Sequence, residues 1–232
     1  MDKLNISYST IKKLRTDEKR RYTEYVLWEK DNEFKDYFVV GTAFHNVVER
    51  QALHGELTRE IGYKYIYDMV SEHGLDETTS KKMLKEFDAC YENYEASKMF
   101  GKGGEAEAKL ELEYNNNYNI KWYLDRIWEW SIYDIKTVWR FEKMEPDQYS
   151  GKYEEYLEQL KLYWYVYKKI RWEEPNSCYI LEVKKNKPRD GEGTRLTEFT
   201  PQEWREEEVE NLLRQASIKM DWLRTLQPND VL

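Results

Sequence analysis

The chain has little cysteine: its 232 residues include only Cys90 and Cys178, which stand far apart. This scarcity excludes a disulfide-stabilised scaffold and a four-cysteine metal site built from this chain alone, and it fits a reducing cytosol. Long uninterrupted apolar runs are also missing. We therefore expect neither a signal peptide nor a membrane-spanning segment, and we expect a cytoplasmic protein without a membrane partner.

The chain also lacks an excess of positive charge. Its net charge is −8, which does not by itself favour a nucleic-acid partner, because lysine and arginine make the contacts to phosphate groups. Positive charge is nevertheless gathered in two stretches. The candidates for phosphate contact are Lys12, Lys13, Arg15, Lys19, Arg20 and Arg21 in the first stretch, and Lys184, Lys185, Lys187 and Arg189 in the second. Most basic stretches are solvated faces, so charge alone leaves both interpretations open.

Aromatic residues are abundant, with 20 tyrosines and 9 tryptophans, and a chain of this length can bury a large core. Apolar residues spaced by three or four predict helices, and alternating apolar and polar residues predict strands. The predicted helices cover 6–30 in two short pieces, 42–54, 58–72, 76–99, 152–170 and 201–226, and the predicted strands cover 108–114, 118–128, 130–138, 176–185 and 194–199. This order predicts an α/β fold with a mixed central β-sheet flanked by helices.

A glycine-rich segment, FGKGG at residues 100–104, separates the predicted N-terminal helices from the first clear strand pattern. Clustered glycines favour turns and flexible joints. We therefore expect an N-terminal helical lobe at residues 1–104 and a β-containing core at residues 105–232, joined as one structural unit.

Three charged residues interrupt strands that are otherwise built for burial. In KWYLDRIWEWSIYDIKT, residues 121–137, Asp134 and Lys136 are two apart and share one face of a strand, while Asp125 lies on the neighbouring strand. Two carboxylates held together are unfavourable unless a cation or a proton lies between them. Carboxylate oxygens suit hard divalent cations, so the pattern favours a metal site with a bound water molecule. The alternative is a structural Asp–Lys ion pair with Asp125 capping a turn, and the pattern leaves both open.

The same residues belong to an ordered set of short motifs. The set contains the GxxxH helix motif from Gly41 to His45, the acidic Glu111 of LELEY, Asp125 of YLDRI, Asp134 and Lys136 of YDIKT, and Gln159 and Tyr163 of QLKLY. In composition and order, over roughly residues 6 to 170, the set resembles the PD-(D/E)XK nuclease superfamily. The resemblance is greatest to its RecB-like branch, which includes CRISPR-associated nucleases and phage exonucleases.

The resemblance implies a restriction-endonuclease-like core and a divalent metal ion as cofactor. By analogy with the family, His45, Asp125, Asp134 and the carbonyl of Ile135 would bind Mg²⁺ or Mn²⁺. Imidazole as one ligand suits Mn²⁺. Lys136 would position or activate the attacking water molecule.

Further residues receive roles from the same resemblance. Gln159 and Tyr163 would orient DNA beside the metal, and Glu111 would be an outer residue of the metal site or a second-metal ligand, with Glu113 as its rival. Where relatives commonly have glycine three residues before the metal-binding aspartate, this chain has Trp122. That tryptophan would either pack in the core or stack on a base.

Many members of this branch also carry four cysteines that hold an iron–sulfur cluster. Neither the N-terminal segment nor residues 190–232 of this chain contain cysteine. We therefore expect no iron–sulfur cluster in this protein.

Taken with the resemblance, the sequence predicts a metal-dependent deoxyribonuclease. An exonuclease that acts on DNA ends in recombination, repair or phage DNA processing is favoured, in the cytosol of a bacterium or a phage-infected host. An endonuclease that cuts junctions or single strands is one alternative, and a non-catalytic nuclease-fold module that binds nucleic acid or protein is another. No P-loop is present, so a helicase, or a protein that binds or anneals single strands, would be a separate partner.

Overall fold

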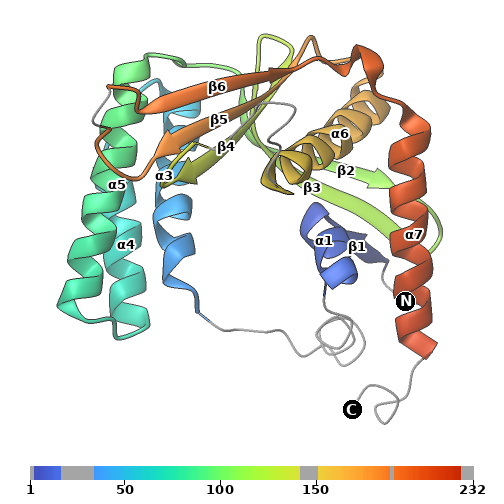
Figure 1. The fold of residues 1–232 in the computed structure, drawn as a ribbon, viewed down its shortest axis with the longest axis horizontal. Helices are drawn as coiled ribbons and strands as arrows, with labels where there is room; N and C mark the ends of the chain where they lie inside the picture. Colours follow the sequence, from blue (N-terminus) through green and yellow to red (C-terminus); the bar gives the residue numbers. More distant parts are fainter. Residues whose placement is uncertain (1–2, 17–33, 142–150, 189–190, 226–232) are drawn as a thin grey trace.

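A computed structural model describes residues 3–16, 34–141, 151–188 and 191–225, and Figure 1 shows their arrangement. In chain order the elements are β1 (Leu4–Ile6), α1 (Tyr8–Thr16), α3 (Asp36–His54), α4 (Glu60–Glu72), α5 (Glu77–Ser97), β2 (Glu105–Glu113), β3 (Tyr118–Trp128), β4 (Ser131–Val138), α6 (Gly151–Arg171), β5 (Cys178–Lys184), β6 (Thr194–Phe199), the short 3₁₀ helix η2 (Pro201–Glu203) and α7 (Glu206–Thr225). The strands form one mixed sheet with helices on both faces, so the predicted α/β class is confirmed.

The hairpin of β2 and β3 forms one end of the sheet. Its turn is closed by Asn115, whose side-chain oxygen accepts hydrogen bonds from the backbone N–H groups of Asn117 and Tyr118. The antiparallel register that follows pairs Glu113 with Asn119 and continues to Glu105 opposite Ile127. This local turn chemistry therefore sets which residues of the two strands face each other.

The other edge of β3 is divided between two strands. β1 pairs in parallel with residues 118–120, and β4 pairs antiparallel with residues 126–128. Residues 121–125 lie between these two pairings, so the sheet opens into a fork in the middle of β3. Asp125 stands at the point where β3 and β4 separate.

The remaining strands complete the sheet beyond β4. β5 lies parallel to β4 and is connected to it through α6, which is the long crossover that parallel neighbours require. β6 then pairs antiparallel with β5 at the far edge.

Each face of the sheet has its own hydrophobic core. On one face α1, α6 and α7 pack on β1, β2 and β3, with Trp164 and Leu124 fully buried among them. On the other face α3 and α5 pack on β4 and β5, where Ile135 and Leu181 are buried, and α4 packs on α3 and α5. Figure 1 shows these two helical groups at opposite ends of the sheet. No helix in the described ranges is both long and apolar enough to cross a membrane.

Residues 100–104 are held by hydrogen bonds rather than left as a free joint. The guanidinium group of Arg126, a fully buried side chain, donates to the carbonyls of Gly101 and Gly103 at 2.7 Å each. Gln51 donates to the carbonyl of Phe100 at 2.8 Å. These bonds tie the segment between α5 and β2 to both helix and sheet. The division at residue 104 stays a prediction.

The structure differs from the predicted elements at β1, α3 and the last helix. β1 was not predicted, because a three-residue strand that pairs only with a distant strand has no pattern of its own. α3 begins at Asp36 rather than at residue 42 and contains Gly41, which lies next to Thr137 of β4. The last helix is interrupted, because Trp204 adopts an extended conformation and packs edge-on against Trp164.

Candidate active site

His45 is presented to the fork of the sheet by α3. The helix crosses β4 at Gly41, where an added Cβ would lie 3.4 Å from Oγ1 of Thr137. One turn later the ring of His45 reaches the backbone of β4, with Nε2 3.0 Å from the carbonyl oxygen of Ile135. The GxxxH spacing therefore couples a close helix–strand contact to the placement of an imidazole.

Asp125 takes the place of backbone pairing where β3 leaves β4. Its Oδ2 accepts a hydrogen bond of 2.5 Å from the backbone N–H of Ile135, and its Oδ1 lies 3.3 Å from Nδ1 of His45. The side-chain alternation of β3 breaks here, since Leu124 and Ile127 both join the core on the α6 side. The carboxylate of Asp125 consequently points into the fork.

Glu107 reaches the same place from β2. It stands opposite Asp125 in the hairpin register, but its backbone has a φ of 46°, a left-handed conformation that non-glycine residues rarely adopt. Its Oε1 lies 3.7 Å from Nδ1 of His45. One ligand atom each of His45, Glu107 and Asp125 lie within 4.8 Å of one another. Sequence reasoning missed Glu107.

The electrostatics of this cluster favour a cation at its centre. Burial alone would lower the pKa of His45, but the carboxylates of Asp125 and Glu107 outweigh burial and raise the pKa to about 10. Burial would raise the pKa of Asp125, and His45 and Lys136 together hold it below its usual value. In the metal-free protein an imidazolium ring therefore supplies the positive charge that these oxygens require.

Asp134 of β4 lies near Asp125 and His45, whose charges act on its pKa, and it also contacts α6. Nζ of Lys136 is 3.0 Å from Oδ1 and 2.8 Å from Oδ2 of Asp134, and Nε2 of Gln159 donates to Oδ1 at 3.3 Å. Gln159 also donates to the hydroxyl of Tyr163 at 2.6 Å. Burial, with a contribution from the charge of Asp125, raises the pKa of Asp134 to about 6.

These contacts define what the side chains around Asp134 can do. Burial would lower the pKa of Lys136, but Asp134 and Asp125 outweigh it and raise the pKa, so the side chain is an ammonium ion at neutral pH. Burial and nearby carboxylates raise the pKa of Tyr163 well above its ordinary value, so its phenol is neutral. Tyr163 is buried against Trp122 and contacts Gln159, which in turn contacts Asp134.

The residues present fit a divalent metal ion. The cluster offers carboxylate oxygens and one imidazole nitrogen, a donor set that suits Mg²⁺ or Mn²⁺. The carbonyl oxygen of Ile135 lies beside Nε2 of His45, while the carboxylates of Asp125 and Glu107 lie beside Nδ1. Among the described residues, Oδ2 of Asp134 is buried without a directed hydrogen bond, although Lys136 is close. Asp134 is not one of the three residues whose ligand atoms converge.

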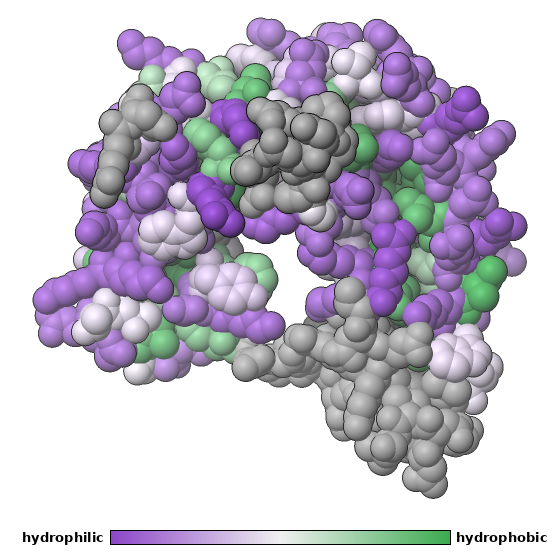
Figure 2. Space-filling model, viewed as in Figure 1, coloured by the Kyte–Doolittle hydropathy of each residue, from purple (hydrophilic) through white to green (hydrophobic). Residues whose placement is uncertain are grey.

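An open cleft of about 590 Å³ leads to the cluster. His45, Glu107 and Lys136 line its inner part, and Tyr37 and Phe38, which are 56% and 60% exposed, line its outer part. In Figure 2 an open space separates the side of α3 from that of α1, and the described surface around it is mostly hydrophilic. A charged polymer can therefore approach the cluster from solvent.

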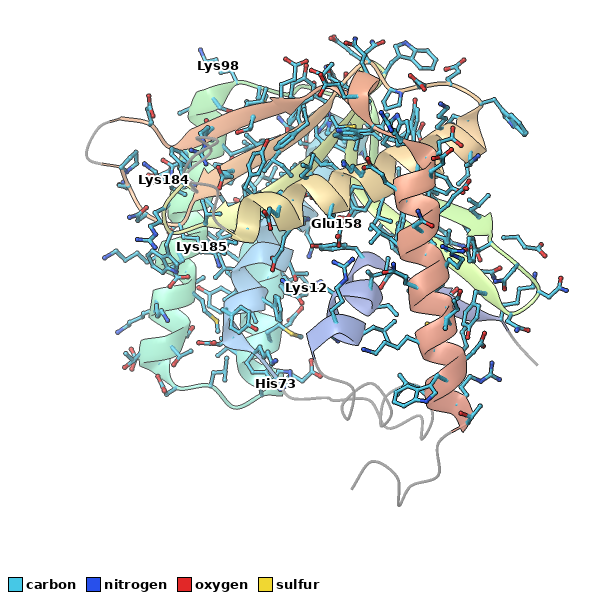
Figure 3. The ribbon with its side chains drawn as sticks, turned by 45° about the vertical axis from the view of Figure 1, so that its right-hand side comes forward. Lys12, His73, Lys98, Glu158, Lys184 and Lys185 are labelled. Carbon is cyan, nitrogen blue, oxygen red and sulfur yellow. The ribbon has the colours of Figure 1, made fainter. Side chains whose placement is uncertain are left out.

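The first basic stretch pairs with acidic residues of α6. Nζ of Lys12 lies 2.7 Å from Glu155, and the guanidinium of Arg15 lies 2.8 Å from Glu158. Figure 3 shows Lys12 and Glu158 on these neighbouring helices. Exposed ion pairs of this kind contribute about 1 kcal/mol or less, so a phosphate group can exchange with the carboxylates.

The other predicted phosphate contacts are spread over several surroundings. Lys13 is half-buried on α1, and Lys184 lies with Nζ 4.2 Å from the ring centre of Phe141. Lys185 is buried and donates to the carbonyl of Tyr37 at 3.3 Å, while the exposed Lys187 pairs with Glu92 at 2.8 Å. Lys19, Arg20, Arg21 and Arg189 lie outside the described residues.

The structure shows where two other residues singled out in the sequence lie. Glu111 is exposed and pairs with Lys109, and it stands opposite Lys121, four residues along β2 from Glu107. At about 3.3 Å per residue this is about 13 Å from Glu107, so Glu107, and not Glu111, is the acidic residue of β2 beside the cluster. Trp122 is buried against Tyr163, so it packs in the core and does not stack on a base.

A pH dependence of stability follows from the imidazolium of His45. In EDTA we expect the free energy of unfolding to be highest below pH 6.5 and to fall as pH rises toward about 10, because the folded protein keeps a proton that the unfolded chain releases. The slope is at most about 1.4 kcal/mol per pH unit. Asp134 adds a further decrease in the free energy of unfolding as pH rises toward about 6. In that range the folded carboxyl is still protonated while the unfolded one is ionised.

Urea unfolding of the wild type and of His45→Gln across this range measures the effect. The variant should show a shallower slope above pH 6.5, because it lacks the ring that keeps a proton in the folded state. Equal slopes in the two proteins would show that His45 is not protonated in the folded state.

Comparisons with known proteins agree with this geometry. A model of the PD-(D/E)XK nuclease superfamily matches residues 5–229. No curated protein matches the chain. The crystal structure of a candidate exonuclease from Eubacterium rectale is similar with a TM-score of 0.58 and 14% sequence identity, covering 94% of this chain and 79% of that chain. At this identity the similarity shows the fold alone.

A second solved structure, of the protein SSO0001, matches with 12% identity over 80% of this chain and 87% of that chain. Its TM-score is 0.38, and nothing here rests on it.

Proposed function

The chain belongs to the PD-(D/E)XK nuclease superfamily, and on this basis we propose that it is a divalent-metal-dependent deoxyribonuclease that acts on DNA ends. The observation that supports this proposal most strongly is the convergence of His45, Asp125 and the backbone of Ile135 at the fork of the sheet, with Lys136 beside them.

The metal ion would be held by the imidazole of His45, the carboxylates of Asp125 and Asp134, and the carbonyl of Ile135, with Glu107 as a further oxygen donor. A bound divalent ion lowers the pKa of a water molecule and neutralises negative charge on a phosphate. Binding requires neutral imidazole, so His45 must give up its proton when the ion arrives.

Lys136 keeps its ammonium charge next to Asp134. In the proposed reaction this ammonium holds the attacking water molecule and offsets the charge that develops on the phosphate, and it does not need to act as a base. Gln159 fixes the orientation of Asp134 and is itself fixed by Tyr163. Gln159 is half-buried and Tyr163 is buried, so Gln159 would make the contact to DNA.

DNA would enter by the open cleft. Lys136 and Lys185 supply positive charge there, and the exposed rings of Tyr37 and Phe38 supply surfaces for stacking on bases. Lys12, Lys13 and Arg15 on one side, and Lys184 and Lys187 on the other, would contact phosphates farther along the strand. Arg20 and Arg21 keep their predicted role without structural support.

Action on DNA ends is favoured over internal cleavage by two observations. The GxxxH and QxxxY motifs resemble those of the end-processing branch of the superfamily. In addition, the similar structure from Eubacterium rectale is described as a candidate exonuclease.

Labelled linear duplex, linear single-stranded DNA and circular single-stranded DNA, each incubated with Mn²⁺, Mg²⁺ or EDTA, test the proposal. We expect linear DNA to be degraded with either metal, circular DNA to survive, and EDTA to stop the reaction. Cleavage of circular DNA would replace the exonuclease by an endonuclease. No cleavage of any substrate would leave a non-catalytic binding module.

A further inference from the structure

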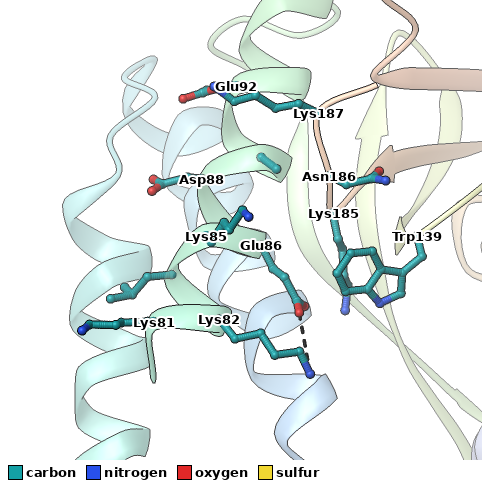
Figure 4. Close-up of a pocket in the computed structure, with 12 residues that line it drawn as sticks. Lys81, Lys82, Lys85, Glu86, Asp88, Glu92, Trp139, Lys185, Asn186 and Lys187 are labelled. Carbon is teal, nitrogen blue, oxygen red and sulfur yellow. Dashed lines mark ion pairs between the residues drawn. The ribbon is translucent and has the colours of Figure 1, made fainter. Parts of the chain in front are cut away.

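A second cavity, of about 850 Å³, lies beside the active-site cleft (Figure 4). It is formed between α5 and the segment that follows β5. Five lysines line it, against three acidic residues, together with one large aromatic ring: Lys81, Lys82, Lys85, Lys185 and Lys187, with Glu86, Asp88 and Glu92, and Trp139. We call this cavity the lysine pocket. Its volume is in the range of sites that bind small molecules and nucleotides.

The acidic residues of the lysine pocket are largely engaged by cations. Glu86 lies 3.9 Å from Lys82, the contact drawn in Figure 4, and Glu92 lies 2.8 Å from Lys187. Arg59, which does not line the pocket, approaches Asp88 and Glu92 at 3.5 Å each.

Lys85 contributes a positive charge that no acidic side chain of the pocket pairs with. Its side chain is exposed, and within the described part of the chain it has no hydrogen bond or ion pair. The lysine pocket therefore retains net positive charge, which favours an anionic ligand.

Trp139 supplies a flat surface in the same cavity. Its side chain is 54% exposed. Figure 4 shows the indole beside Lys185 and Asn186. Lysine ammonium groups next to an exposed indole form the combination that binds a nucleotide, with phosphate on the cations and base on the ring.

The lysine pocket adjoins the active-site cleft. Lys185 lines both cavities, and its backbone N–H donates to the carbonyl of Val138 at 2.7 Å. Trp139 follows Lys136 by three residues, which is about 10 Å along an extended chain. A strand bound at the metal cluster can therefore reach Trp139 within a few nucleotides.

We propose that the lysine pocket binds an unpaired nucleotide of the DNA strand, away from the bond that is cut. This inference rests on the proposed function and adds a substrate class, a strand with a single-stranded portion long enough to span from the metal cluster to Trp139. Lys82, Lys85 and Lys187 contact the phosphate, and Trp139 stacks on the base. Glu86 and Glu92 hold the lysine side chains in place until DNA replaces them.

Binding of fluorescently labelled single-stranded DNA, measured by anisotropy in EDTA, tests the inference without cleavage. We compare oligonucleotides of about four and about sixteen nucleotides. Trp139→Ala should bind the long oligonucleotide roughly tenfold more weakly than wild type and the short one equally. Trp139→Phe, which keeps an aromatic ring, should restore most of the affinity. Lys85→Gln should reduce the salt dependence of binding by about one phosphate contact.

Matched controls come from exposed residues outside both cavities. Trp172→Ala removes an indole that is 90% exposed, and Lys64→Gln removes an exposed lysine of α4. Neither should change binding. The inference is overturned if Trp139→Ala and Lys85→Gln bind the long oligonucleotide as the wild type does, or if they weaken the short one equally. Absence of metal-dependent cleavage in the wild type would instead overturn the proposed function.

Discussion

Asp134→Asn is expected to abolish metal-dependent cleavage of DNA, with a fall in kcat of about 10³-fold or more. The carboxylate of Asp134 is buried and is contacted by Lys136 and Gln159. Solvent therefore cannot compensate for the loss of its negative charge. If Asp134 binds the ion as proposed, losing this charged ligand and the adjacent ammonium contact would cost several kcal/mol of transition-state stabilisation, which corresponds to this factor.

The same substitution should leave the fold intact. Burial raises the pKa of Asp134 to about 6, which means that the charged carboxylate is less stable in the folded protein than in water. Asparagine has nearly the same shape and removes that charge, while Asp125 still attracts Lys136. Urea unfolding in EDTA should therefore give a midpoint close to that of the wild type.

Initial rates on a labelled linear substrate at saturating Mn²⁺ measure the loss. Asp68→Asn, which makes the same chemical change on the exposed face of α4, is the control and should keep full activity. A folded Asp134→Asn variant that still cleaves DNA at a comparable rate would remove Asp134 from the catalytic site.

The second large effect is expected at Glu107, in contrast to Glu111. Glu107→Gln should weaken Mn²⁺ binding by about 10- to 100-fold, because Glu107 is one of the three residues whose ligand atoms converge. Glu111→Gln makes the same change on the same strand. It should have no effect, because the side chain of Glu111 is exposed and paired with Lys109.

Isothermal titration of the two variants with Mn²⁺ distinguishes the two glutamates. Equal affinities for Mn²⁺ in the wild type and Glu107→Gln would show that Glu107 lies near the ion without binding it. A loss of affinity in Glu111→Gln would instead favour the choice that the LELEY motif suggested.

Glu107 could have been found from the sequence by counting. The turn at residues 115–117 places Tyr114 next to Tyr118, and the backbone hydrogen bond between them is present at 3.1 Å. Continuing that register along the hairpin brings Glu107 opposite Asp125. The motif resemblance pointed to Glu111 because a motif is matched by residue type along one strand. The hairpin register instead identifies which residues of the two strands lie opposite each other.

Other parts of the site could not be predicted in this way. The pairing of β1 with β3 joins residues more than a hundred positions apart, and this pairing helps to define the fork. The alternation of β3 also breaks between Leu124 and Ile127, where Asp125 contacts His45 of α3. Such a break depends on tertiary packing and leaves no periodic signal.

The helices and most strands were predictable because their patterns are local. β3 was predicted with its observed bounds of Tyr118–Trp128, and β6 with its bounds of Thr194–Phe199. α3 was predicted too short because Gly41 was read as a helix start. In the fold it is an interior residue where the helix contacts β4, so close packing outweighs the low helix propensity of glycine.

Anomalous scattering from crystals soaked in Mn²⁺ tests the convergence of the metal ligands most directly. We expect one strong peak at the fork of the sheet, roughly 2 Å from a ring nitrogen of His45, carboxylate oxygens of Asp125 and Asp134, and the carbonyl oxygen of Ile135. The peak should disappear in crystals of His45→Gln soaked in the same way. A well-ordered crystal with no manganese at the fork, or with the ion bound elsewhere while DNA is still cleaved, would contradict the proposed site.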